Sequence, residues 1–157
     1  MTPDCTLADT ALDPPRELAL LAEQEDGAGA LASFTGIARP LAADGREVAA
    51  MFLEHHPVMT LRSLQEIGEE AAARFPLHRL RIIHRCGAIA PGEPIVFVAA
   101  TARHRKAALE AVDFTMDRLK TDAIFWKRED RADGSEWIEP TADDHASRAA
   151  WQDRTEG

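Results

Sequence analysis

The three lysines of this chain, Lys106, Lys120 and Lys127, fall within one 22-residue window. Between Thr101 and Arg131 there are eight Lys and Arg residues against six Asp and Glu, a local balance of +2, although the whole chain has a formal charge of −9. A positive segment on an acidic body favours a small anionic ligand, because the overall negative charge repels nucleic acid at long range. The alternative is a set of ordinary solvated surface charges, and the clustering counts against it.

A helix predicted from Arg103 to Lys120 sets the distance between the two ends of this positive segment. One face of it is cationic at both ends and apolar between them, with Arg105, Leu109, Val112, Met116 and Lys120 at helical spacing. About 15 residues separate Arg105 from Lys120, or roughly 22 Å along the helix, so one small ligand cannot touch both. Two copies in a symmetric dimer could bring one chain's Arg105 near the other's Lys120.

The start of the same helix favours phosphate binding. His104 and Arg105 lie in its first turn, where free backbone N–H groups and the positive end of the helix dipole attract anions. First-turn cations are also common on ordinary surfaces. The pattern therefore indicates an anion site without establishing one.

Lys127 follows two aromatic residues in a segment predicted to be extended. Alternation places Lys127 on the same face as Phe125, and Trp126 on the other. An ammonium held against apolar surface and beside Arg128 loses its proton more easily, as acid–base or nucleophilic chemistry requires. The alternative is a surface lysine whose stem covers apolar atoms while its ammonium stays in water.

Other chemistries find little support in the sequence. Cys5 and Cys86 are far apart and lack metal-ligand spacing, and no glycine-rich nucleotide loop occurs. The neighbours His55 and His56 face opposite sides of a predicted strand, which favours structural roles. His84 shares strand parity with Cys86 and is a weaker candidate. We therefore predict no metal and no cofactor.

The elements that must position these residues are read from periodicity and turn residues. Helices are predicted from Pro14 to the glycines at 27 and 29, over 57–75 and over 103–120, and strands over 29–36, 48–55, 80–84, 94–100, 124–129 and 136–139. The second strand is expected to pair with the first, and 130–134 is expected to form a hairpin turn. Because strands arrive in adjacent pairs, the sequence favours an α+β fold over a doubly wound parallel sheet.

The length and the termini indicate how the chain is organised. The 157 residues suit a single domain over 1–157, with residues 1–5 and 152–157 as loose ends. The N-terminus lacks a basic start followed by an apolar run, and the longest strongly apolar stretch, 95–100, is too short to span a bilayer. With only two separated cysteines, a cytoplasmic setting is expected.

Several short motifs follow one another in a recognisable order. They are Phe34-Thr-Gly-Ile-Ala-Arg39, Leu53-Glu-His-His-Pro-Val-Met59, Ile83-His-Arg-Cys-Gly87, Pro91-Gly-Glu93, His104-Arg105, Met116-Asp-Arg-Leu-Lys120 and Phe125-Trp-Lys-Arg-Glu129. In order and spacing they closely resemble the large, catalytic subunit of molybdopterin synthase, over about residues 15 to 151.

The resemblance implies an α/β-hammerhead-type fold with an additional small antiparallel β subdomain. It implies a sulfurtransferase of molybdenum cofactor biosynthesis that inserts two sulfurs into cyclic pyranopterin monophosphate, giving the dithiolene of molybdopterin. The sulfur would come from the C-terminal Gly-Gly thiocarboxylate of a small ubiquitin-like subunit. The implied assembly is a heterotetramer built on a homodimer of large subunits.

The resemblance also assigns roles to residues. Lys120 and Lys127 would be catalytic, through proton transfer and stabilisation of an oxyanion. The implied substrate-binding residues are Arg39, His104, Arg105, Phe34, Met116 and Arg128. Among these, Arg39 would orient the tail or the substrate, while His104 and Arg105 would bind the phosphate and pterin end from the second large subunit.

Three positions depart from the family pattern, and two other functions compete. His56 stands where Tyr is frequent, Val58 where Gly is usual, and Thr141 where some relatives have an anion-binding arginine, for which Arg131 or Arg103 could compensate. The first competing function is a non-catalytic adaptor that binds a ubiquitin-like protein. The second is a lysine enzyme that forms a Schiff base with a phosphorylated carbonyl compound.

Overall fold

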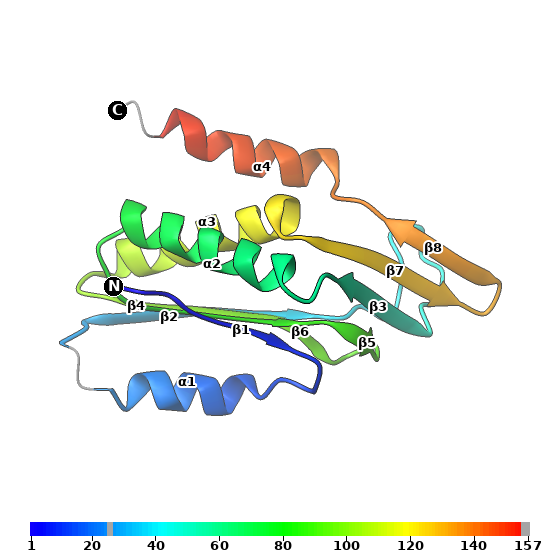
Figure 1. Cartoon of the computed structure of the whole chain (residues 1–157), viewed down its shortest axis with the longest axis horizontal. Helices are drawn as coiled ribbons and strands as arrows, with labels where there is room; N and C mark the ends of the chain where they lie inside the picture. Colours follow the sequence, from blue (N-terminus) through cyan, green and yellow to red (C-terminus); the bar gives the residue numbers. More distant parts are fainter. Residues whose placement is uncertain (25–26, 155–157) are drawn as a thin grey trace.

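The computed structural model describes residues 1–24 and 27–154. Figure 1 shows the path of the chain. The elements are β1 (Asp4–Ala8), α1 (Pro14–Ala22), β2 (Ala30–Ile37), β3 (Ala50–His55), α2 (Met59–Arg74), β4 (Leu77–Arg85), β5 (Gly87–Ile89), β6 (Pro94–Ala102), α3 (Arg105–Asp122), β7 (Phe125–Arg131), β8 (Gly134–Ile138) and α4 (Ala142–Asp153).

The first sheet has the order β1-β4-β6-β2 and forms the middle layer of the molecule. Its pairs are antiparallel except for β1 with β4, which is parallel. Helices α2 and α3 cover one face, α1 covers the other, and α4 lies outside α3 (Figure 1). Because both faces are covered, the central strand β6 is apolar almost throughout, and Val98, Ala99 and Ala100 are fully buried.

The second, smaller sheet has the order β5-β3-β7-β8 and is antiparallel throughout. Its β7–β8 hairpin turns at the predicted place, and Gly134 there has φ of 139°, which a glycine adopts without strain. The two sheets with helices packed on the first confirm the predicted α+β class with an additional antiparallel β subdomain.

The predicted pairing of the second strand with the first is wrong. Strand β2 pairs with β6, whereas β3 pairs with β5 and β7. The turn-rich segment between β2 and β3 closes on itself, with the Val48 N–H donating to Pro40 O at 2.8 Å and a bridge between Leu41 and Glu47. This segment carries the chain from one sheet to the other, so neighbours in sequence are not neighbours in the sheet.

Both chain ends are more ordered than the sequence predicts. Asp4 and Cys5 lie in β1, so the expected loose N-terminus is wrong for these residues. At the other end α4 runs to Asp153, and Trp151 packs edge-on against Phe75 and Phe114 in the main core. The expected loose tail is thus wrong for residues 152 and 153, and its residues 155–157 lie outside the described part.

Candidate functional site

Lys120 lies in the last turn of α3, at the end of the helix nearest the second sheet. The helix is continuous from Arg105 to Asp122, so the separation of roughly 22 Å between Arg105 and Lys120 holds within one chain. The Lys120 side chain is exposed, and no hydrogen bond or ion pair to it occurs among the described residues. It is an ammonium available to a ligand.

Lys127 lies in β7, between Leu53 on β3 and Ile138 on β8. Trp126 is 52% exposed on the opposite face, and Phe125 packs against the core, which confirms the predicted alternation. Lys127 itself is half-buried, and within residues 1–24 and 27–154 it has neither an ion pair nor a hydrogen bond from its ammonium. Burial has removed part of the water around this ammonium, and the protein does not fully replace the lost hydrogen bonds.

Burial lowers the pKa of Lys127, and the charges that act on it show which residues share its surroundings. Glu129 and Asp144 raise the pKa, whereas Lys120 and Arg39 lower it. We call these five residues the lysine group. The structure therefore brings together the two predicted catalytic lysines and Arg39.

Asp144 belongs to this group although it was not predicted as a site residue. It lies in the first turn of α4, where its carboxylate accepts from the Thr141 N–H at 2.9 Å and the Thr141 hydroxyl accepts from the Asp144 N–H at 3.1 Å. Burial alone would raise the pKa of Asp144, but these hydrogen bonds and the Lys120 charge hold it below its ordinary value. The Thr-x-x-Asp spacing is a helix-start signal that could have located this residue in the sequence.

His84 is a second residue whose position the sequence left open. Its ring is buried on β4 and stacks on Phe125, with the ring centroids 4.2 Å apart. Nδ1 lies 2.8 Å from Arg85 O and is therefore the protonated nitrogen. Burial lowers the pKa of His84 to about 4; the bond to Arg85 opposes this, and the Lys120 charge adds to it.

Phe34 and Met116, two of the implied substrate-binding residues, form an apolar wall on the helix-covered side of the first sheet. Phe34 is 44% exposed and shares strand parity with Ala32, which packs in the core beneath α2 and α3. Met116 packs partly buried against the same core. Arg39 follows the end of β2 and is exposed, and its positive charge lowers the pKa of Lys127.

His104 and Arg105 lie at the far end of α3 from Lys120. His104 is the N-cap residue but makes no side-chain capping bond, and both side chains are exposed. The start of the helix therefore carries two cationic or polar groups directed to solvent. One chain does not bring them to the lysine group.

Arg128 is not brought to the lysine group either. It lies on the Trp126 face of β7, where its Nε donates to Asp130 at 2.8 Å. Its guanidinium also lies 4.9 Å from the Phe52 ring centroid and 5.7 Å from that of Trp137. Within one chain its predicted role in substrate binding has no structural support, because adjacent strand residues point to opposite faces.

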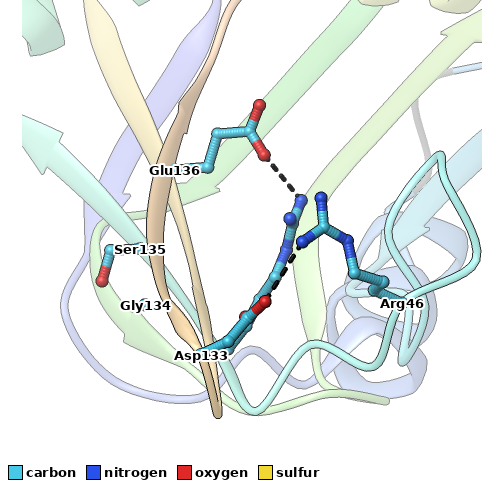
Figure 2. A pocket seen from close by; sticks show the side chains of 6 residues that line it. Arg46, Asp133, Gly134, Ser135 and Glu136 are labelled. Carbon is cyan, nitrogen blue, oxygen red and sulfur yellow. Dashed lines mark hydrogen bonds and ion pairs between the residues drawn. The ribbon is translucent and has the colours of Figure 1, made fainter.

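A pocket at the β7–β8 turn is not suited to an anion, although two arginines line it. Arg46 is paired with Asp133 (Figure 2), with 3.1 Å between the charged atoms, and the neighbouring Arg131 is paired with Glu136 at 2.8 Å. Asp44 lies 3.7 Å from Arg131, so three carboxylates face two guanidinium groups. Arg131 is therefore already neutralised, and the structure does not support it as a replacement for the arginine missing at Thr141.

The remaining candidates have structural explanations. His56 Nδ1 accepts from the backbone N–H groups of Val58 and Met59, so this ring caps the start of α2. Cys5 and Cys86 are free thiols. Among the described residues there is no cluster of three metal-ligating side chains, and no helix there is long and apolar enough to cross a membrane.

Comparisons with known proteins agree on one family. A family model described as MoaE protein matches residues 7–122. A molybdopterin synthase catalytic subunit from Pseudomonas aeruginosa is 50% identical over 143 residues, covering 91% of this chain and 95% of the relative. A solved MoaE protein of molybdopterin biosynthesis from Burkholderia ambifaria has a TM-score of 0.80 at 39% identity, covering 96% of this chain and 98% of that one.

A further solved structure is similar in fold. It is a complex of subunits 1 and 2 of molybdopterin-converting factor from Helicobacter pylori, and the matched chain has a TM-score of 0.67 at 20% identity, with 88% of this chain and 90% of that chain covered.

Proposed function

This chain belongs to the MoaE protein family, and we propose that it is the catalytic subunit of a molybdopterin synthase. The reaction converts cyclic pyranopterin monophosphate to molybdopterin by inserting two sulfurs as a dithiolene. The observation that carries this proposal is the grouping of Lys120 from α3, Lys127 from β7 and Arg39 from the segment after β2, with no ion pair to either lysine among the described residues. Such a group can receive an anionic tail and move protons beside it.

The sulfur is supplied by a small ubiquitin-like subunit that carries a C-terminal Gly-Gly thiocarboxylate. The state of the two cysteines supports this source. Burial raises the pKa of Cys5 to about 11, and burial also raises the pKa of Cys86. Because the thiolate is the reactive form, neither thiol is suited to carry sulfur itself.

The lysines divide the chemistry between them. Burial lowers the pKa of Lys127, which suits a residue that exchanges protons with the reacting atoms. Lys120 is exposed and suits stabilisation of the oxyanion that forms as the thiocarboxylate delivers its sulfur. Arg39 orients the tail or the substrate, and Phe34 and Met116 supply the apolar wall.

The substrate's phosphate is bound by a second copy of the chain. The continuous α3 helix keeps His104 and Arg105 too far from Lys120 to share one small substrate within a chain. A homodimer supplies them in trans, and two small subunits complete a heterotetramer. We place this assembly in the cytoplasm, where free thiols such as Cys5 and Cys86 persist.

Two other functions remain distinguishable from this one. A non-catalytic adaptor for a ubiquitin-like protein would have no use for a half-buried lysine with a lowered pKa, so the state of Lys127 counts against it. A Schiff-base enzyme would form a covalent lysine adduct with its substrate. Borohydride trapping with substrate alone, in the absence of the small subunit, would reveal that adduct.

The direct test is reconstitution. The purified chain is mixed with thiocarboxylated small subunit and cyclic pyranopterin monophosphate, and the dithiolene product is measured. We expect product only when all three are present. The control replaces the thiocarboxylate by the ordinary carboxylate form of the small subunit, and absence of product from the complete mixture would refute the proposed function.

A further inference from the structure

His84 occupies a position that the proposed chemistry does not yet use. It shares strand parity with Leu80 and Ile82, so it faces the side of the first sheet that α2 and α3 cover. The helix core ends there, and the ring of Phe125 lies over the imidazole. Phe125 and Lys127 share a face of β7, and Lys120 lies five residues before Phe125 in the chain. His84 therefore lies beneath Phe125, close to the end of α3 that carries Lys120.

The hydrogen bonding of the ring fixes which nitrogen is free. Nδ1–H donates to Arg85 O at 2.8 Å, so Nε2 carries the lone pair of the neutral imidazole. Within the described residues Nε2 makes no hydrogen bond, and it is not completely sealed from solvent. An acceptor that keeps some exposure and is unused by the described part of the fold requires an explanation.

We propose that His84 is a positioning residue for Lys120: Nε2 accepts a hydrogen bond from the Lys120 ammonium when that flexible side chain turns toward the sheet. This bond holds the lysine in its charged form and aims it at the oxyanion. The reach follows from the path of the chain, because Phe125, whose ring stacks on His84 with the centroids 4.2 Å apart, lies five residues after Lys120. The effect of the Lys120 charge on His84 agrees with this proximity. The contact is inferred from the positions of the two residues, whereas its part in turnover rests on the proposed function.

Several other charges belong to the surroundings of Lys120 and Lys127. Lys127 and Glu129 on β7, Asp144 on α4 and Arg39 after β2 all belong to the lysine group. His145 acts on Asp144 in turn. None of these is changed by a substitution at His84, so the difference between His84 variants isolates the imidazole.

Two substitutions separate the two ring nitrogens. In His84→Asn the side-chain amide N–H lies where Nδ1–H lies and can keep the bond to Arg85 O, but no acceptor replaces Nε2. In His84→Gln the amide reaches the place of Nε2 and restores an acceptor. A structural role for His84 predicts that the better-folded variant is the more active, whereas a positioning role predicts that His84→Gln is the more active whatever the stability.

The first readout needs no substrate. The pH dependence of acetylation at Lys120 is followed by mass spectrometry, with Lys106 at the far end of α3 as the internal reference. In His84→Asn the midpoint of the Lys120 curve is expected to move down by about 0.5 in pH, because an acceptor to the ammonium has been removed, and in His84→Gln it is expected to return toward wild type. Identical curves in all three proteins would overturn the inference.

A second measurement covers the case in which a His84 variant fails to fold. The Nε2 nitrogen resonance of otherwise wild-type protein is compared with that of Lys120→Ala, a substitution at an exposed position. The resonance is expected to shift when the lysine is removed, and no change contradicts the contact.

Turnover then connects the contact to function. In the reconstituted assay His84→Asn is expected to lose about fivefold in rate and His84→Gln less, as for a lost hydrogen bond to a charged group. If the His84 variants and wild type turn over at equal rates while the Lys120 labelling curve still shifts, the role of His84 in turnover is rejected and the contact is kept. If the wild type makes no product while its labelling curve still depends on His84, the proposed function fails and the contact remains.

Discussion

The partial burial of Lys127 destabilises the fold but suits acid–base chemistry. Burial lowers the pKa of this lysine, which means that the fold disfavours its charged form. Glu129 and Asp144 compensate only in part, since neither is ion-paired with it. The same lowering of its pKa makes the Lys127 amine a better proton carrier near neutral pH.

The three lysines allow a matched test at the residue scale. Lys120→Ala and Lys127→Ala are each expected to lower the rate of dithiolene formation by at least about tenfold, because each removes an acid–base or electrostatic group. Lys106→Ala is the control, since this exposed lysine lies at the other end of α3. Binding of the small subunit, measured by calorimetry, should stay near wild type in all three. A wild-type rate in either of the first two variants would remove that lysine from the mechanism.

His84 predicts a specific sensitivity to acid. Burial lowers its pKa from 6.5 to about 4, so the unfolded chain takes up this proton at a higher pH than the folded chain. Stability from this group is complete above pH 6.5 and is lost as the pH falls toward 4, by on the order of 3 kcal/mol. Urea unfolding across this range should show a smaller loss in His84→Asn than in wild type. Parallel losses would show that His84 titrates normally in the fold.

At the scale of elements, a pair of hydroxyl groups on α2 fixes where β7 begins. The Thr60 hydroxyl donates to Ile124 O at 2.6 Å and accepts from the His56 N–H at 2.8 Å, while the Ile124 N–H donates to the Ser63 hydroxyl at 3.1 Å. Ile124 lies between Lys120 and Lys127, so these bonds set the angle between the end of α3 and the start of β7. The distance between the two lysines depends on them.

We call these hydrogen bonds between α2 and Ile124 the clamp. Thr60→Val tests it without changing the shape of the side chain. The substitution leaves two backbone groups without their partner at a fully buried position, and we expect it to destabilise the fold by about 1–3 kcal/mol. Thr121→Val is the matched control, because that hydroxyl only donates back to Asp117 O within α3. The measurement is the free energy of unfolding in urea, and equal losses in the two variants would argue against the clamp.

Elements with strong local signals were predictable from the sequence, and those defined by distant partners were not. The helix α3 and the β7–β8 hairpin follow from periodicity and turn residues, so their bounds were predicted to within a few residues. Strand β1 is short and pairs with β4 far along the chain, and Trp151 is the one large apolar residue of α4. Strand β1 has no local pattern strong enough to predict it, and the local signal for α4 is limited to the capping box of Thr141 and Asp144 at its start.

The same limit applied to the site. Lys120, Lys127 and Arg39 were predicted from charge clustering and from the family resemblance, and the structure brings them together. Asp144 and His84 reach the lysines from α4 and β4, so their positions depend on how whole elements pack. Composition and spacing carry no information on that packing.

At the scale of the whole molecule, the length of α3 makes the proposed active site a property of two chains. Within one chain Arg105 and Lys120 lie at opposite ends of a continuous helix. A chain that lacks Arg105 can then still offer its Lys120 to a partner, and the reverse also holds. An inactive variant at Arg105 and an inactive variant at Lys120 should therefore complement each other in a mixed dimer.

Complementation by mixing tests this arrangement. When Arg105→Ala and Lys120→Ala proteins are unfolded together and refolded, half of the dimers are mixed, and each mixed dimer has one intact site, so about a quarter of the wild-type rate is expected. Lys120→Ala mixed with Lys127→Ala is the control, because both lysines belong to the same chain's lysine group and no intact site can form. Failure of the first mixture to recover activity would place the phosphate-binding residues elsewhere.

The distribution of the tryptophans gives the molecule two optical signals. Trp151 is only 5% exposed in the aromatic core, whereas Trp126 and Trp137 are 52% and 55% exposed on the smaller sheet. A buried indole emits at shorter wavelength than a hydrated one, so the fluorescence spectrum contains separate contributions from the core and from the sheet that carries Lys127. Loss of the shorter-wavelength (blue) emission of Trp151 reports unfolding, and the longer-wavelength (red) emission comes from Trp126 and Trp137. A change in the red component at constant blue intensity reports arrival of a partner at the smaller sheet, without any attached dye.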